Sequence, residues 1–264
     1  MLRKEFIFVM FLIVVLQLTL IRVEGYSGSQ IVTPLLTKPV TIDGQWTSAD
    51  EWSDALVISL INCDCSNVTA SGYLYAKHDP SNFYFLIDFT SSTVMDANND
   101  GMSVMLDPQH NDGTVPQSDD REFITFPIPP GSAMRAGTGV QGSGWSLSPV
   151  PQGVKMAYSM ASSSSQAQPH EIAEFLLPFS TFPGMQNTIG FTVTAVHGTR
   201  ASSQFSLADW PANFARENVA TWGELTISAT PIPEFPYVWL IIDVTLLVSL
   251  TLAWSRRRGS PRPV

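Results

Sequence analysis

Oxygen-bearing side chains are concentrated between positions 96 and 107. Asp96, Asn98 and Asp100 take the first, third and fifth places of a loop, Gly101 takes the sixth, and Asp107 follows. Calcium prefers such clustered hard oxygen ligands. The spacing predicts that Asp96, Asn98, Asp100 and Asp107 hold one Ca²⁺, although the twelfth place is not the Glu of an EF-hand. The alternative is an Asx-rich turn that enters a strand without an ion.

A second group of oxygen ligands follows directly along the chain. Its members are Asp107, Asn111, Asp112, Asp119 and Asp120. The pattern indicates an oxygen-rich edge that offers another place for a hard cation.

Two tryptophans are candidates for stacking against a sugar ring. Trp145 and Trp210 lie in segments rich in Gly, Ser and Pro, where an aromatic ring can stay exposed. Arg121 and Arg216 are candidate hydrogen-bonding partners for the hydroxyls, together with Glu122 and Asn213. Burial of both tryptophans in the core is the competing interpretation.

Motifs for catalysis are not found. The sequence contains no Gly-x-Ser-x-Gly, no His-Glu-x-x-His and no glycine-rich phosphate loop. The four histidines are scattered, and pairs of carboxylates arise by chance in so acidic a chain. We therefore expect a protein that is not an enzyme.

Both ends of the chain predict export and membrane attachment. Residues 1–25 have the basic start and apolar run of a signal peptide. Residues 237–254 are apolar over a length that crosses a bilayer, and the arginines of the tail at 255–264 follow. We expect the domain on the extracellular face of the plasma membrane and the C-terminus in the cytoplasm, with an uncleaved N-terminal anchor as the alternative.

The segment before the apolar stretch, residues 231–236, reads Pro-Ile-Pro-Glu-Phe-Pro. It resembles the PEF-type sorting signals of archaeal surface proteins. The resemblance implies an archaeosortase-like enzyme that replaces the helix with a lipid anchor. A rigid proline-rich spacer is the alternative.

Cysteine and glycosylation signals cluster in one short segment. Cys63 and Cys65 are the only cysteines, and in an exported protein we expect a disulfide between them. That disulfide would close a very small, strained ring, so free or intermolecular thiols and metal binding are the alternatives. Asn67 begins an Asn-Val-Thr sequon, as expected of an exported glycoprotein.

The span left between the two ends, residues 26–230, is acidic and β-rich. From residue 26 to 233 there are 7 Lys and Arg and 19 Asp and Glu, so the formal charge is 7 − 19 = −12. This charge argues against nucleic acid as a ligand and suits cations or neutral sugars. About nine apolar runs, several alternating with period 2, predict an all-β, antiparallel β-sandwich with almost no helix.

Several of these segments carry a family resemblance. Thr41-Ile42-Asp43-Gly44-Gln45-Trp46 with Glu51-Trp52, Asp100-Gly101 with Asp107, Glu174 to Pro178, Ile189-Gly190-Phe191 and Trp222-Gly223 resemble, in order, family 9 carbohydrate-binding modules and the related DOMON-like sandwiches. The match spans residues 40–228. It implies a non-catalytic module that binds a polysaccharide or glycan.

Two other functions are compatible with the sequence. Some DOMON-like sandwiches hold haem through Met with His or Lys, and Lys77, His78 and His197 are the residues here that could do so. A structural protein of the cell envelope that binds no small ligand is the third possibility.

Overall fold

The computed structural model describes residues 29–62, 71–111, 113–128, 131–141, 143–199, 204–212 and 214–228. The expected signal peptide, the PEF-like segment, the apolar stretch at 237–254, Cys63, Cys65 and Asn67 lie outside these ranges. In the part of the chain that is described, helices long and apolar enough to cross a bilayer are not found.

The described chain is built almost entirely of strands. It contains thirteen strands and two short 3₁₀ helices. In chain order they are β1 (Gln30–Thr33), β2 (Leu56–Asn62), β3 (Ser71–His78), β4 (Asn82–Phe89), β5 (Gly101–Asp107), β6 (Arg121–Ile128), β7 (Gly131–Val140), β8 (Gly144–Ser148), β9 (Lys155–Ala161), β10 (His170–Pro178), η1 (Phe179–Thr181), β11 (Thr188–Thr199), β12 (Gln204–Trp210), η2 (Val219–Thr221) and β13 (Gly223–Ile227).

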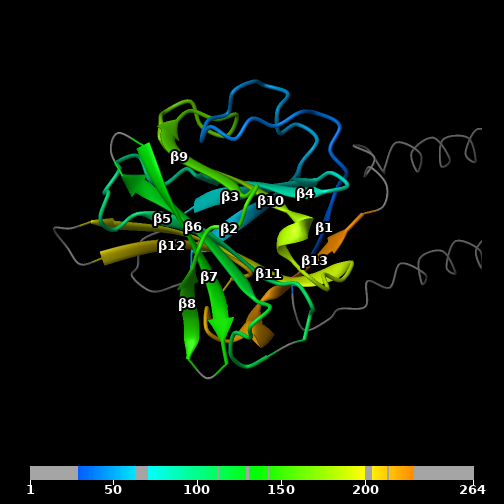
Figure 1. Cartoon of the computed structure of the whole chain (residues 1–264). Coiled ribbons are helices and arrows are strands. Elements are labelled where there is room, and N and C mark those ends of the chain that lie inside the picture. The colour runs from blue at the N-terminus through cyan, green and yellow to red at the C-terminus, as the bar shows by residue number, and fades with distance from the viewer. Residues whose placement is uncertain are drawn as a thin grey trace, which may run out of the picture.

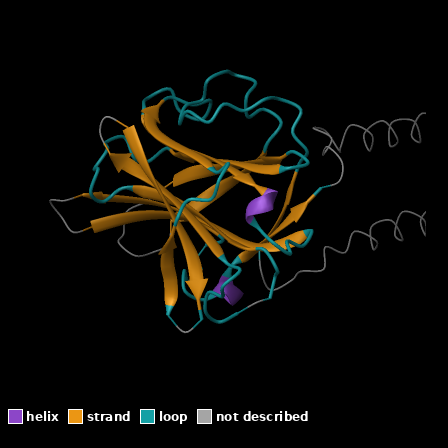
Figure 2. Cartoon of the chain, in the orientation of Figure 1, coloured by secondary structure: helices purple, strands orange, loops and turns teal. Residues whose placement is uncertain are grey.

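The strands form a hydrogen-bonded network that folds into two layers (Figures 1 and 2). The first layer has the order β8-β7-β6-β5-β11-β12, and the second has the order β2-β3-β4-β10-β9. Among the described residues, two residue pairs, Ala208 with Asn62 and Asp209 with Ile61, connect β12 to β2. Strand β13 pairs with β11 and, in parallel, with β1. The predicted antiparallel sandwich is therefore confirmed for this domain.

Aromatic rings from both layers meet in the core. Phe85 of β4 stacks on Phe191 of β11 with ring centroids 5.0 Å apart, and both rings are fully buried. Phe83 contacts Phe179 of η1 edge-on at 4.7 Å. Each such ring stabilises the sandwich by about 1.5–3 kcal/mol relative to its exposed state.

A loop of residues 34–55, the covering loop, packs on the outer face of the second layer. Trp52 is 1% exposed and lies in a cluster with Tyr75, Tyr84, Leu86 and Ile172. Because the loop covers that face, β4 is buried on both sides, as its continuous apolar run predicts. Strand β2 also has a continuous apolar run, but Val57 is 49% exposed, so one face of β2 is open to solvent.

Candidate functional site

A groove of about 400 Å³ opens on the outer part of the first layer. Strands β6, β7 and β8 form its floor, and the loop between β12 and η2 forms one wall. Its lining residues are Glu122, Ile124, Arg135, Gly137, Ser143, Gly144, Trp145, Ser146, Leu147, Arg216 and Glu217.

Trp145 is the aromatic side chain of this groove. It is half-buried, and its ring lies parallel to that of buried Trp222, with the centroids 6.1 Å apart. Gly137 on β7 lies beside the ring, and a Cβ there would be in van der Waals contact with it at 3.5 Å and closer to the Glu122 carboxylate, at 3.2 Å. The ring is thus held in a fixed orientation at the groove.

A charge pair lies beside the ring. The Arg216 guanidinium donates to both carboxylate oxygens of Glu122, through Nε at 2.9 Å and Nη2 at 2.6 Å, and it lies 5.8 Å from the Trp145 ring centre. Burial raises the pKa of Glu122, and the hydrogen bond from Arg216 acts in the opposite direction. Arg216 also donates to Glu217 at 2.7 Å.

The formal charges of the lining cancel. Glu122 and Glu217 offset Arg135 and Arg216, so the groove offers donors and acceptors without a strong net field. Such a surface, with one fixed aromatic ring, suits a neutral polyhydroxyl ligand.

The residues expected to bind sugar are only partly brought together. Trp145, Arg216 and Glu122 share the groove, whereas Asn213 lies outside the described residues. Trp210 is 7% exposed and contacts Phe191 in the core, so its prediction as a sugar platform is wrong. Its segment is rich in Pro and Asn, but β12 turns the ring inward.

Arg121, which the sequence predicts as a sugar-binding residue, does not lie in the groove. It is adjacent to Glu122 on β6, and successive side chains of a strand point to opposite faces. Its guanidinium donates to the carbonyls of Ser118 and Asp120, and it does not line the groove.

The four residues predicted to share one calcium ion cannot do so. Asp100 precedes β5 and Asp107 ends it, so the strand holds them roughly 20 Å apart. Asp96 instead accepts hydrogen bonds from the Asn98 backbone at 3.1 Å and the Asn99 side chain at 2.9 Å. That geometry is the Asx-rich turn of the alternative interpretation, with Asn98 exposed to solvent.

The second oxygen-rich edge is compact for the residues that are described. Carboxylate oxygens of Asp107, Asp119 and Asp120 lie within 4.8 Å of one another. Asn111 connects two of them, donating from its backbone to Asp107 at 3.1 Å and from its side chain to Asp119 at 3.2 Å. Burial, followed by the nearby charges of Asp107 and Asp119, raises the pKa of Asp120 to about 7.

Two of the three residues considered for haem have close partners of their own. Lys77 is fully buried and donates to Asp54 Oδ1 at 2.6 Å and to the Glu51 carbonyl. His78 Nδ1 lies 3.1 Å from the Thr33 hydroxyl. The third, His197, contacts Asp100, and it joins Glu171 in a group that the sequence pattern does not reveal.

Comparison with known proteins shows the fold. The chain matches no protein-family model and no curated protein by sequence. It is similar to solved structures of a family 9 carbohydrate-binding module from Caldicellulosiruptor kristjanssonii. The complex with cellotriose has a TM-score of 0.55 and 13% identity over 79% of this chain and 97% of that one. The complex with glucose has a TM-score of 0.56 and 12% identity over 79% of this chain and 100% of that one.

The class that the fold defines is therefore the carbohydrate-binding-module type of β-sandwich. At this identity the likeness establishes the architecture, and the function has to be argued from the groove and the other side-chain groups.

Proposed function

We propose that this chain displays a non-catalytic carbohydrate-binding domain at the cell surface, with the groove around Trp145 as its sugar site. The observation that carries the proposal is the combination of a fixed aromatic ring with a bidentate Glu122–Arg216 pair in one charge-balanced groove. The exposed part of the Trp145 ring would contact the C–H face of a pyranose, and the partly exposed Arg216 guanidinium, held by Glu122, would orient its hydroxyls.

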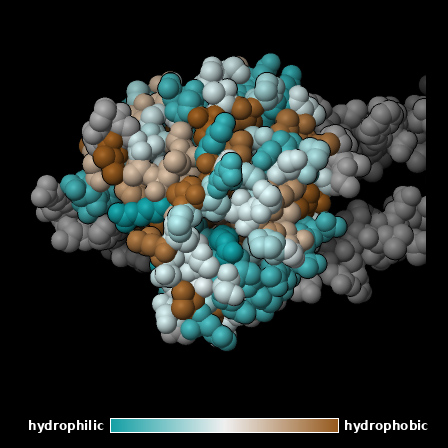
Figure 3. Space-filling view, in the orientation of Figure 1, coloured by the Kyte–Doolittle hydropathy of each residue, from teal (hydrophilic) through white to brown (hydrophobic). Residues whose placement is uncertain are grey.

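The fold similarity supports the same class of ligand. The two similar structures contain cellotriose and glucose, which are neutral sugars. The face in Figure 3 favours a small polar ligand over a broad protein contact, because its hydrophobic residues lie in separate groups among hydrophilic ones.

A binding measurement on the full chain in detergent tests this proposal. A glycan array identifies the sugar, and calorimetry with that sugar and with cellotriose measures the affinity. Trp145→Ala should weaken binding about tenfold or more. Tyr73→Ala is the matched control, because this exposed aromatic residue lies on β3 of the other layer. Equal affinities for both variants would refute the groove as the site.

Calcium is proposed at Asp107, Asp119 and Asp120. Three carboxylates with oxygens within 4.8 Å of one another supply the hard oxygen ligands that Ca²⁺ prefers. Asp120 Oδ1 is buried without a hydrogen-bond partner in the described structure, which leaves one oxygen available for an ion. Titration with Ca²⁺ in calorimetry should give one site that Asp120→Asn removes.

The proposed surface location rests on the sequence of the two ends. Export through residues 1–25 and retention by residues 237–254 and the arginine tail would place the domain outside the membrane. Mass spectrometry of the mature chain tests both steps. A start near Tyr26 would support signal cleavage, and an end near residue 235 would support processing by an archaeosortase-like enzyme.

A further inference from the structure

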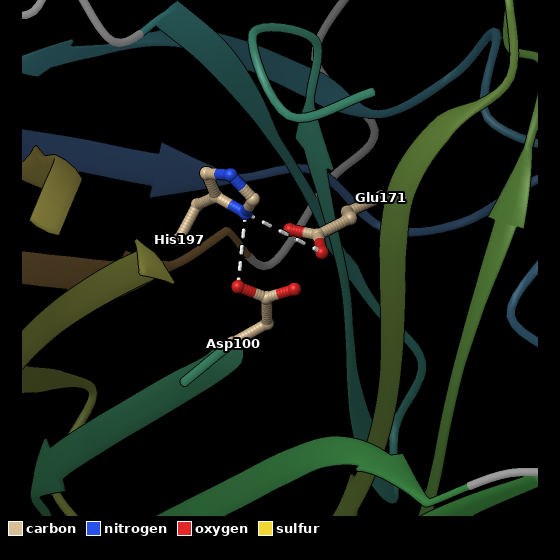
Figure 4. A group of neighbouring side chains, drawn as sticks. All are labelled: Asp100, Glu171 and His197. Carbon is tan, nitrogen blue, oxygen red and sulfur yellow. Dashed lines mark ion pairs between the residues drawn. The ribbon is translucent and has the colours of Figure 1, made fainter. Parts of the chain in front are cut away.

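A second side-chain group lies apart from the groove, at one end of the sandwich. Asp100 Oδ1 is 2.9 Å from His197 Nδ1, and His197 Nδ1 is 4.0 Å from Glu171 Oε1. Figure 4 shows the His197 ring directed toward both carboxylates. Asp100 precedes β5 and His197 lies on β11 of the first layer, whereas Glu171 lies on β10 of the second.

Glu171 and His197 occupy strand positions whose neighbours on the same face are apolar core residues. Ala173, Phe175 and Leu177 are buried in the core between the layers, and Glu171 continues the same alternating row. His197 likewise continues the row of Val193 and Ala195 on β11. Charged groups at such positions are costly unless they are paired or bind a metal.

Glu171 is the residue that points to a ligand. Its side chain is fully buried, and neither carboxylate oxygen makes a hydrogen bond of normal geometry among the described residues. The hydroxyl of Tyr158, also buried, faces the same carboxylate without a bond of normal geometry. The Glu171 carboxylate thus lies beside Asp100, Ser92 and Tyr158 without a hydrogen bond of normal geometry to any of them.

We propose that Asp100, Glu171 and His197 bind a divalent transition metal that joins the two layers of the sandwich. Zn²⁺ takes His nitrogen and carboxylate oxygen at similar short distances, whereas Ca²⁺ prefers oxygen ligands alone. The ligand atoms of tetrahedral zinc lie about 3.3 Å apart. The separations of His197 Nδ1 from the two carboxylates, 2.9 and 4.0 Å, bracket that value, and all three ligand atoms lie within 4.8 Å of one another.

Charge balance supports a dication. The carboxylates of Asp100 and Glu171 carry two negative charges when ionised, which one M²⁺ cancels. His197 is 16% exposed at its side chain and offers a path for entry of the ion.

The test is Zn²⁺ binding to the full chain in detergent after treatment with EDTA. The expected result is one site at which Zn²⁺ raises the unfolding temperature. Calorimetry should give a stoichiometry of one Zn²⁺ per chain.

Two variants and a matched control assign the site. Glu171→Gln and His197→Gln should each weaken Zn²⁺ binding at least about 100-fold. Loss of a metal ligand costs more affinity than loss of a residue that only hydrogen-bonds to a ligand, which usually costs about 10–100-fold. Glu171→Gln also removes a buried ionisable group, so it should fold without metal. His110→Gln alters a partly exposed histidine near Glu224 and should leave binding unchanged.

Three outcomes would overturn the proposal. These are absence of Zn²⁺ binding to the parent protein, equal Zn²⁺ binding by Glu171→Gln, and loss of the Zn²⁺ effect in Asp120→Asn with Glu171→Gln unaffected. The last outcome would indicate that Zn²⁺ binds at Asp107, Asp119 and Asp120 instead. Sugar affinity of the same samples is a separate readout, so failure here does not bear on the groove.

Discussion

Glu174 on β10 accepts a hydrogen bond from the backbone N–H of Gly44, 2.8 Å away, and thereby attaches the covering loop to the second layer. The same carboxylate accepts from the Asp43 backbone at 2.9 Å and from Trp52 Nε1 at 3.2 Å. One buried side chain therefore organises the Ile-Asp-Gly turn and the buried tryptophan together.

Glu174→Ala should destabilise the domain by about 3 kcal/mol. The substitution leaves the buried N–H groups of Gly44 and Trp52 without an acceptor, and each such group costs about 1–3 kcal/mol. Denaturant unfolding followed by tryptophan fluorescence measures the change. Asp43→Asn is the control, because that exposed side chain lies in the same turn. A similar cost for both variants would contradict the role given to Glu174.

Gly44→Ala should also destabilise the covering loop. Gly44 has φ +77°, and a Cβ there would lie 3.0 Å from the Tyr158 backbone, so both strain and a clash oppose Ala. We expect a loss of about 2 kcal/mol or more in the free energy of unfolding. At Gly101→Ala, where the nearest atom to a new Cβ is 3.6 Å away, the change should be much smaller. If Gly101→Ala costs as much, local geometry at Gly44 is not the cause.

Part of this fold can be predicted from residue patterns. Strands β5, β9 and β11 have apolar residues at every second position because one face of each packs into the core. The pattern does not predict β7 and β8. Met134 and Leu147 on them are 44% and 74% exposed, so these strands depend on pairing with β6 and leave little periodicity in the sequence.

The residues of the candidate site can likewise be predicted only in part from the sequence. Composition identifies Trp145, because a ring in a Gly- and Ser-rich segment can stay partly exposed. It misleads at Trp210, where pairing of β12 with β11 turns the ring inward. Glu171 and His197 meet across two layers, and a single sequence contains no signal for such contacts.

Calcium and pH should act together at Asp120. Its pKa is about 7 in the folded protein and about 3.8 in the unfolded chain, so between these values the folded state binds more protons. Stability without calcium should therefore fall as pH rises from about 4 to 7, by at most about 1.4 kcal/mol per pH unit, and the contribution should be constant above pH 7.

Unfolding in EDTA at pH 5 and pH 8 measures this effect. Asp120→Asn should reduce the loss of stability between the two pH values, and Ca²⁺ should restore stability at pH 8 in the parent protein only. Asp43→Asn is the control for removal of an acidic group elsewhere. An unchanged pH dependence in Asp120→Asn would show that Asp120 does not titrate in this range.

Neighbouring residues on β6 should differ sharply in their effect on sugar binding. Glu122→Gln removes the charge that holds Arg216, which then loses one charge-assisted hydrogen bond in the groove. We expect sugar affinity to fall about tenfold. Arg121→Gln should have little effect, because Arg121 points to the other face of the strand and contacts Ser118 and Asp120.

Calorimetry with the sugar found on the array measures both variants, and fluorescence unfolding confirms that each is folded. The comparison is specific because the two residues are adjacent on one strand and their side chains point to opposite faces. If Arg121→Gln weakens binding more than Glu122→Gln does, the ligand contacts the acidic edge of Asp107, Asp119 and Asp120. In that case the groove around Trp145 is not the sugar site.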